Sequence, residues 1–259
     1  MSPGIHVLYV DDDPDIRELS ATVLERTSDE FDVTTAGSGR EGLALLDDGL
    51  GVDCIVSDYQ MLELDGLEFF DAVRDRDPDV PFLLVTGTRP SEIASEAIDA
   101  GVTDYLRKGA VTGTAQCTVL ANRIEHAVEK RRLERARDEI DRQLERYRVL
   151  VENAADPMYT LDENGTVTMV NDAMVDWIGY DRDRLVGSAI ETVLTDDTVE
   201  CATDALRRMT EAETPAPACF EWTFEASDGR RRVSQTTVAP LRTGDGEFAG
   251  SAGVVRERT

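Results

Sequence analysis

The sequence predicts two domains joined by one long helix: an α/β domain with a buried parallel sheet, then an α+β domain with an antiparallel sheet. Short apolar runs alternate with helical patterns as far as Lys108. Residues 114–153 contain neither proline nor glycine. After Asn153, two alternating stretches with an Asn-Gly or Asp-Gly turn signal indicate hairpins. A length of 259 residues suits two domains.

Four apolar runs in the first part of the chain are typical of parallel strands that are buried on both faces. Helical patterns fill the stretches between them, so the strands should alternate with helices within one sheet. The runs are Ile5–Val10, Cys54–Val56, Phe82–Val85 and Tyr105–Leu106.

Reactive side chains follow these runs along the chain. They are Asp11 and Asp12, Asp58, Thr86 and Lys108. Ligands bind outside the carboxyl ends of parallel strands, so these side chains should converge on one crevice. Lys108 is notable because the sequence has only two lysines among its 27 basic residues. Its compact charge would face the carboxylates.

This set of residues suits phosphoryl transfer with Mg²⁺. Clustered carboxylates hold Mg²⁺, which demands octahedral oxygen ligation and keeps several waters. An ammonium and a hydroxyl stabilise an incoming phosphoryl group, and an aspartate can be the nucleophile. A structural salt-bridge cluster is one alternative. A haloacid-dehalogenase-type Asp-x-Asp at Asp11 and Asp13 is another, disfavoured because Pro14-Asp15 follows.

Residues 4–125 resemble the receiver domain of two-component response regulators in the stretches "VLYVDDDPDIRE", "CIVSDYQMLELDGLEFF", "FLLVTG" and "AGVTDYLRKG". The resemblance implies a flavodoxin-like, doubly wound sheet of five parallel strands. It also implies Asp58 as the phosphoacceptor and Tyr105 as the aromatic switch. Thr86 and Lys108 would bind the phosphoryl group. The implied Mg²⁺ ligands are Asp11, Asp12, Asp58 and the backbone carbonyl of Gln60.

Two positions depart from the family pattern. Leu62 follows Met61 where the family usually has Met-Pro, and Gly109 follows Lys108 where it usually has Lys-Pro. The second change removes the usual reason for a cis peptide bond. Glycine can supply unusual backbone dihedrals in its place.

The charge balance is strongly acidic, with 53 acidic against 27 basic residues and a formal net charge of −26. Such a surface repels nucleic-acid phosphate, so we expect no direct DNA binding. Dispersed Asp and Glu with scarce Lys are typical of a halophilic archaeal protein. Molar salt would screen the self-repulsion, because the Debye length at 1 M is only about 3 Å.

The sequence also indicates a cytoplasmic protein without a membrane insertion. It has no apolar run near the roughly 18 residues that a spanning helix needs, and no signal peptide. Its cysteines have no metal-ligand spacing and read as reduced thiols. They are Cys54, Cys117, Cys201 and Cys219.

The proline-free and glycine-free stretch predicts a coiled-coil linker at residues 126–146, between a first domain at 1–125 and a second at 147–259. Apolar residues recur with the alternating spacing of four and three that a coiled-coil seam requires. They are Ile140, Leu144, Tyr147, Val151 and Ala154. A parallel dimer is the favoured interpretation, and a solvated single helix is the alternative.

The second domain resembles a PAS domain in the stretches "NAADPMYTLDENGTVTMVNDA", "IGYDRDRLVG" and "VVRERT". The resemblance implies a pocket between the helices and the sheet, and a role in ligand sensing or dimerisation. This domain lacks histidine, so a histidine-ligated haem is not expected. Trp177 and Trp222 read as core or dimer-contact residues. The sequence identifies no ligand and leaves open that the pocket holds none.

We therefore expect a phosphorelay response regulator rather than a separate enzyme. A sensor histidine kinase would donate the phosphoryl group, and the helical linker would relay the state to the PAS domain of a homodimer. The downstream partner would be a protein that the sequence does not identify. Two alternatives remain: a PAS-based small-molecule sensor, and a transcription-regulating adaptor, each with the receiver as a secondary input.

Overall fold

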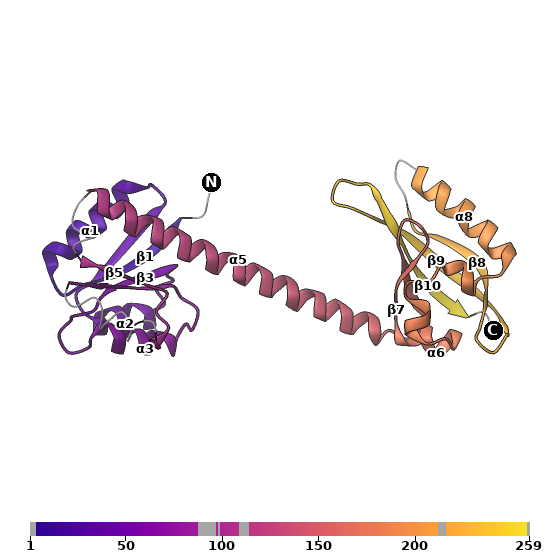
Figure 1. Ribbon diagram of the computed structural model, residues 1–259, viewed down its shortest axis with the longest axis horizontal. Helices are drawn as coiled ribbons and strands as arrows, with labels where there is room; N and C mark the ends of the chain where they lie inside the picture. The colour runs from indigo at the N-terminus through magenta and orange to yellow at the C-terminus, as the bar shows by residue number, and fades with distance from the viewer. Residues whose placement is uncertain (1–3, 88–96, 98, 109–113, 212–215, 258–259) are drawn as a thin grey trace. The chain divides into compact units, whose positions relative to one another are not determined.

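The computed structural model describes residues 4–87, 97, 99–108, 114–211 and 216–257. It divides into two compact units, Met1–Ile140 and Asp141–Thr259. Helix α5 (Thr114–Glu152) runs through the division (Figure 1). The predicted domain boundaries after residues 125 and 146 both fall within this helix. Gly109 lies outside the described residues, as does the side chain of Cys117.

The first unit is built on five parallel strands in the order β2-β1-β3-β4-β5. This order confirms the doubly wound parallel sheet that the sequence predicts. The strands are β1 (Ile5–Val10), β2 (Phe31–Ala36), β3 (Cys54–Asp58), β4 (Phe82–Thr86) and β5 (Asp104–Arg107).

Helices cover both faces of this sheet. They are α1 (Pro14–Thr27), α2 (Gly39–Asp47), α3 (Gly66–Arg74) and the first part of α5. One core joins the sheet to α1 and α5 through Leu24, Leu120 and Ile124. A second core joins the sheet to α2 and α3 and contains Phe69 and Phe70. Neighbouring residues of β1 enter different cores, because successive strand side chains point to opposite faces.

Helix α5 changes character along its length. Leu120, Ile124 and Val128 are buried, whereas Leu144 is 60% exposed. The other large apolar side chains exposed along this later part are Leu133, Ile140, Tyr147, Val149 and Leu150. Three of the predicted seam residues are therefore uncovered in the single chain. Pairing of two copies stays a prediction.

The second unit is an antiparallel sheet in the order β7-β6-β10-β9-β8, with helices packed on it. This confirms the predicted α+β fold. The strands are β6 (Met158–Leu161), β7 (Val167–Val170), β8 (Ala218–Glu225), β9 (Arg231–Arg242) and β10 (Phe248–Glu257). The helices are α6 (Asp172–Ile178), α7 (Arg182–Leu185), the 3₁₀ helix η2 (Ile190–Val193) and α8 (Asp196–Glu211).

Asn171 fixes the end of α5 to this second unit. Its side-chain nitrogen donates to the backbone carbonyls of Val151, Ala154 and Asp156, at 3.2, 3.4 and 3.0 Å. Its side-chain oxygen accepts from the backbone N–H groups of Met158 and Met174. The buried amide thereby fixes the last turn of α5 through Val151 and the segment after the helix through Ala154 and Asp156.

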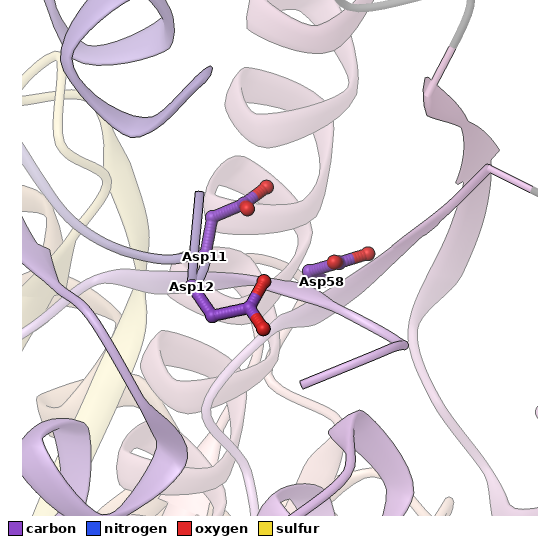
Figure 2. A group of neighbouring side chains, drawn as sticks. All are labelled: Asp11, Asp12 and Asp58. Atoms are coloured by element: carbon purple, nitrogen blue, oxygen red, sulfur yellow. The ribbon is translucent and has the colours of Figure 1, made fainter. Parts of the chain in front are cut away.

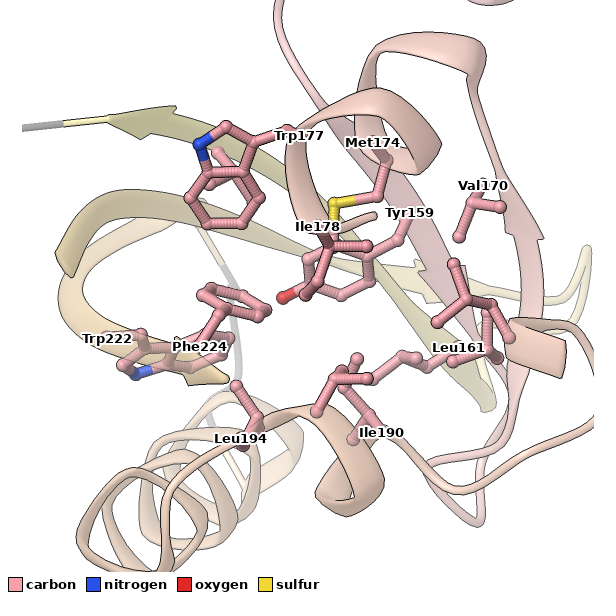
Figure 3. Packing of buried hydrophobic residues seen from close by; sticks show 14 of the residues in the cluster. Tyr159, Leu161, Val170, Met174, Trp177, Ile178, Ile190, Leu194, Trp222 and Phe224 are labelled. Carbon is pink, nitrogen blue, oxygen red and sulfur yellow. The ribbon is translucent and has the colours of Figure 1, made fainter. Parts of the chain in front are cut away.

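Aromatic rings fill the space between the sheet and helices of the second unit (Figure 3). Phe224 packs edge-on against Trp177, with ring centroids 5.3 Å apart, and against Tyr159 at 6.5 Å. Trp222 is also buried in this cluster, so both tryptophans are core residues, as expected. Gly253 faces the Tyr159 ring, where an added Cβ would lie only 2.2 Å from a ring carbon. A glycine is therefore required beside this tyrosine.

Candidate functional site

The predicted site residues meet at the carboxyl edge of the parallel sheet. Asp11 follows β1, Asp58 ends β3, Thr86 ends β4 and Lys108 follows β5. Asp11 is 0% exposed and Asp58 is 3% exposed. Thr86 is also buried, and it follows Val85, the residue that pairs with Asp58 across β3 and β4. Figure 2 shows the carboxylates of Asp11, Asp12 and Asp58 gathered at this edge. The topology thus brings together residues that are far apart in the sequence.

Lys108 supplies the positive charge of the site. Its Nζ lies 2.6 Å from Asp58 Oδ2, and 3.3 and 3.2 Å from Asp11 Oδ1 and Oδ2. Burial alone would lower the pKa of Lys108, but the hydrogen bond and charge of Asp58, together with Asp11, raise it. The lysine is therefore a charged partner of both carboxylates.

The pKa values of the two buried carboxyl groups remain raised despite this lysine. Burial raises the pKa of Asp58 and of Asp11 above the usual aspartate value, and Lys108 only partly offsets it. Like charge adds to the effect, from Asp11 on Asp58 and from Asp12 on Asp11. A second cation at this edge would relieve both contributions.

The donor set fits Mg²⁺. One carboxylate oxygen each from Asp11, Asp12 and Asp58 lies within 4.8 Å of the others. Asp58 Oδ1 is buried without a hydrogen-bond partner among the described residues, and Asp11 Oδ2 is buried in ion-pair contact with Lys108. Asp12 is exposed, which leaves the open side that Mg²⁺ needs for its waters. Three carboxylates facing one ammonium, with Asp58 Oδ1 lacking a hydrogen-bond partner among the described residues, suit a hard cation better than a closed salt-bridge cluster.

The other predicted site residues lie nearby. Gln60 follows β3 with an exposed side chain, and its carbonyl as a metal ligand stays a prediction. Tyr105 lies on β5, half-buried against the α2–α3 core, and its switch role stays a prediction. Leu62, which replaces the usual proline, is 78% exposed. Glu63 beside it has a positive φ of 70°, so this loop takes a conformation that non-glycine residues seldom adopt.

Three supporting residues were not identified from the sequence. Asp13 caps α1, and its backbone N–H donates to Asp11 Oδ1 at 3.0 Å. Arg17 donates to the backbone oxygen of Asp11 at 2.7 Å. Gly66 lies so close that an added Cβ would be 2.5 Å from the Asp58 carbonyl oxygen. The capping-box pattern that starts at Asp65 could have located Gly66, because it sets where α3 begins.

Two family models match the chain. Residues 7–114 match the response regulator receiver domain, and residues 151–259 match the PAS fold. The fold and the acidic edge of the sheet agree with the first match. The N-terminal domain is a receiver domain and the C-terminal domain is a PAS domain. The chain therefore has the domain content of a two-component signalling protein.

Curated relatives match part of the chain. The transcriptional regulatory protein GlrR of Escherichia coli strain K12 is 38% identical over 105 residues, which are 40% of this chain and 22% of GlrR. Response regulator SaeR of Staphylococcus aureus strain USA300 is 31% identical over 103 residues, 40% of this chain and 43% of SaeR. The chain spans less than half the length of these relatives.

Solved structures resemble each domain separately. A response regulator receiver domain protein from Clostridium thermocellum is 28% identical, with a TM-score of 0.44, covering 50% of this chain and 98% of that one. The PAS domain of an HTR-like protein from Haloarcula marismortui is 22% identical, with a TM-score of 0.40, covering 48% of this chain and 99% of that one. Among the described helices, none is long and apolar enough to cross a membrane.

Proposed function

We propose that the protein is a phosphorelay response regulator that accepts a phosphoryl group on Asp58. The observation that supports this most is the pairing of Asp58 Oδ2 with Lys108 at 2.6 Å while Oδ1 has no hydrogen-bond partner among the described residues. The Asp58 carboxylate therefore lies beside an ammonium group, which lowers the cost of bringing a phosphoryl anion to it. An aspartate carboxylate can act as the nucleophile in such a transfer.

In the proposed reaction, an Asp58 oxygen attacks the phosphorus of a phosphohistidine on a sensor kinase. The new P–O bond forms as the P–N bond breaks, and the histidine leaves with the bonding electrons. Lys108 and the Thr86 hydroxyl bind oxygens of the transferred group. Asp11, Asp12, Asp58 and the Gln60 carbonyl would hold Mg²⁺, which would neutralise charge on the transferred group. The protein catalyses only its own phosphorylation and dephosphorylation, so we do not class it as a separate enzyme.

Phosphorylation with a small phosphodonor tests the acceptor. Wild type should incorporate label from acetyl phosphate and Mg²⁺, and Asp58→Asn should incorporate none. Asp71→Asn on the exposed face of α3 is the matched control and should label normally. Label on another residue in Asp58→Asn protein would refute the assignment.

We also propose that two copies pair through the later part of α5, with a partner protein downstream. Leu144 lies in an exposed apolar stripe, and burying one leucine side chain contributes roughly 1.5–3 kcal/mol. Light scattering should show a dimer in molar KCl and a monomer for Leu144→Asp. Glu145→Gln, beside the seam, should remain dimeric. A monomeric wild type at tens of micromolar would contradict the proposal, since facing leucines should outweigh association entropy at about that concentration.

The net charge of −26 leads us to propose that the protein is adapted to molar salt, as in halophilic archaea. Self-repulsion is unscreened at low ionic strength. Circular dichroism should show loss of structure on dilution from molar KCl, and a flat response would count against salt adaptation. The cytoplasmic location stays a prediction.

A PAS-based sensor is the second candidate function, and one observation favours it. Tyr159 Oη and the indole nitrogens of Trp177 and Trp222 are buried without hydrogen-bond partners in the described part of the chain. Such atoms would be satisfied by a polar ligand. Mass spectrometry of material extracted from the purified protein would reveal it. A transcription-regulating adaptor remains a further alternative, to be tested by co-purification with a DNA-binding partner.

A further inference from the structure

Asp11 and Asp12 are consecutive in the chain, yet both direct their carboxylates to one site. One oxygen of each lies within 4.8 Å of the other and of an Asp58 oxygen (Figure 2). Successive side chains of an extended strand point to opposite faces, so the chain must turn here. Strand β1 ends at Val10, and Asp12 lies in a bend. The orientation of the peptide between the two aspartates therefore decides whether Asp12 faces Asp58.

The two side chains are fixed to different degrees. Asp11 Oδ1 accepts from the backbone N–H of Asp13 at 3.0 Å, and Lys108 Nζ lies 3.3 Å from Oδ1 and 3.2 Å from Oδ2. Asp12 is exposed, and its side chain forms no hydrogen bond or ion pair with another described residue. Asp11 is thus held through its own carboxylate, whereas the position of Asp12 depends on the backbone that precedes it.

Arg17 of α1 holds this backbone. Its Nη1 donates to the carbonyl oxygen of Asp11 at 2.7 Å, and this carbonyl belongs to the peptide that joins Asp11 to Asp12. On the other side, the N–H of Asp11 donates to the carbonyl oxygen of Ala36 at 3.1 Å. A hydrogen bond from a charged group is roughly twice as strong as one between neutral groups. The bond from Arg17 is therefore the stronger of the two, and it acts directly on the peptide that leads into Asp12.

Arg17 contacts the backbone of the site rather than its carboxylates. Lys108 binds carboxylate oxygens of Asp11 and Asp58, whereas Arg17 binds Asp11 through the backbone oxygen. Its guanidinium lies beside Gly37 in the loop between β2 and α2, where an added Cβ would be 3.1 Å from Nη1. The arginine therefore supports the loop after β1 and leaves the carboxylate oxygens available to a metal.

We propose that Arg17 is a positioning residue for the magnesium site. By holding the carbonyl oxygen of Asp11, it keeps the following peptide in the orientation that presents Asp12 to Asp58, and so it sets the affinity for Mg²⁺. The proposal rests on the magnesium site of the proposed function. It adds to that site a residue that contacts neither the metal nor the phosphoryl group.

The direction of the effect on Mg²⁺ affinity separates this role from that of a nearby charge. An arginine that acts only through its charge repels Mg²⁺, so its removal would tighten binding. Loss of a residue that orients metal ligands weakens binding instead, by about tenfold or more. Isothermal titration calorimetry of the full-length protein with Mg²⁺ measures the change and needs no phosphodonor.

Arg17→Met removes the donor and keeps an unbranched side chain. Its dissociation constant for Mg²⁺ should rise about tenfold. Arg17→Lys retains a cationic donor and should recover most of the lost affinity. Arg26→Met, at an exposed position in the last turn of the same helix, is the matched control and should bind Mg²⁺ as wild type does. With saturating Mg²⁺, Arg17→Met should label with acetyl phosphate at the wild-type rate, because the Asp58 nucleophile is unchanged.

Gly37→Ala tests the same contact from the loop between β2 and α2, and it carries the test if Arg17→Met does not fold. The added methyl group crowds Nη1 of Arg17, so it should weaken Mg²⁺ binding in the same direction and by less. Gly51→Ala is the control, because a Cβ added there meets no atom within 4 Å. It should bind Mg²⁺ with the affinity of wild type.

Unchanged or tighter Mg²⁺ binding by Arg17→Met would overturn the inference. Equal weakening in Arg17→Met and Arg17→Lys would also overturn it, because the donor would then not be the cause. Absence of Mg²⁺ binding by wild type would overturn it together with the proposed metal site. If acetyl phosphate fails to label Asp58 while the calorimetric difference persists, the phosphorelay proposal alone is refuted.

Discussion

The receiver edge and the PAS core both contain buried polar atoms without partners, but they differ in what surrounds those atoms. In the receiver, Asp58 Oδ1 and Asp11 Oδ2 lie next to Lys108 and the exposed Asp12. In the PAS domain, Tyr159 Oη is enclosed by apolar rings. Because charged groups converge at an accessible edge of the receiver, their chemistry indicates a reaction. The neutral donors in the apolar PAS core carry no such chemistry, so they indicate at most that a ligand binds there.

The difference shows why functional residues are easier to predict from the sequence in a parallel sheet. Successive parallel strands bring their last residues to one edge whatever lies between them in the sequence. A residue such as Lys108 is therefore assigned to a site by its position in a strand. In the antiparallel PAS sheet, the position of Tyr159 gives no such information, because its surroundings depend on packing with Phe224 and Gly253.

The largest expected effect tests whether the two regions are independent. Phe224→Ala leaves a cavity among Tyr159 and Trp177 and should destabilise the PAS domain by about 3–5 kcal/mol. Both tryptophans of the chain lie in this domain, so fluorescence during denaturant unfolding reports on it alone. Val233→Ala, at an exposed position, is the control.

Labelling of Asp58 by acetyl phosphate should be unchanged in the Phe224→Ala protein. If labelling falls together with PAS stability, the receiver edge and the PAS core are coupled and do not act independently.

A smaller effect is expected at the receiver edge. Without Mg²⁺ at pH 7, Asp58→Asn should stabilise the receiver by about 1 kcal/mol, because it removes one of two buried like charges. Hydrogen exchange of the β3 amides measures this, with Asp71→Asn as the control. Saturating Mg²⁺ should stabilise wild type, so that wild type becomes more stable than Asp58→Asn. A less stable Asp58→Asn protein in the absence of Mg²⁺ would mean that the Lys108 ion pair is favourable on balance.

The pH dependence of this difference has a definite sign. Burial raises the pKa of Asp58 and Asp11 in the folded protein, so between the unfolded and folded values the folded state binds more protons. Their contribution to stability falls as pH rises from about 3.9 through the raised values. The advantage of Asp58→Asn should vanish in acid and reach its full size above the raised pKa of Asp58. An advantage that grew towards acid pH would contradict this cause.

The smallest effect decides between a dry PAS core and a liganded one. Tyr159→Phe removes a buried hydroxyl without a partner and should raise stability by up to about 1 kcal/mol if nothing binds there. Tyr147→Phe, exposed on α5, should be neutral. Tryptophan fluorescence gives both values. A marked loss of stability in Tyr159→Phe would show that the hydroxyl has a partner, and would favour the sensor function.

The sequence predicted the receiver fold and the meeting of Asp58 and Lys108 at one edge of the sheet because each signal is local. Asp58 and Lys108 are charged residues directly after apolar runs. Strand β2 was missed because its sequence mixes polar and apolar residues, as suits an edge strand with a partly exposed face. The pairing of Arg131 with Asp77 was missed for a different reason. It depends on how α5 passes the loop after α3, and no local pattern specifies that path.

Asn171 has a consequence for how such proteins are assembled from parts. Its amide nitrogen contacts the end of α5 and the residues that follow it through backbone carbonyls alone, which any sequence presents. Among the described residues of this joint, Glu152 adds side-chain contacts, to Arg182 and to the backbone N–H of Asp172. The Asn171 hydrogen bonds therefore place few demands on the side chains of the incoming helix, and an exchange of the upstream helix sequence should preserve them.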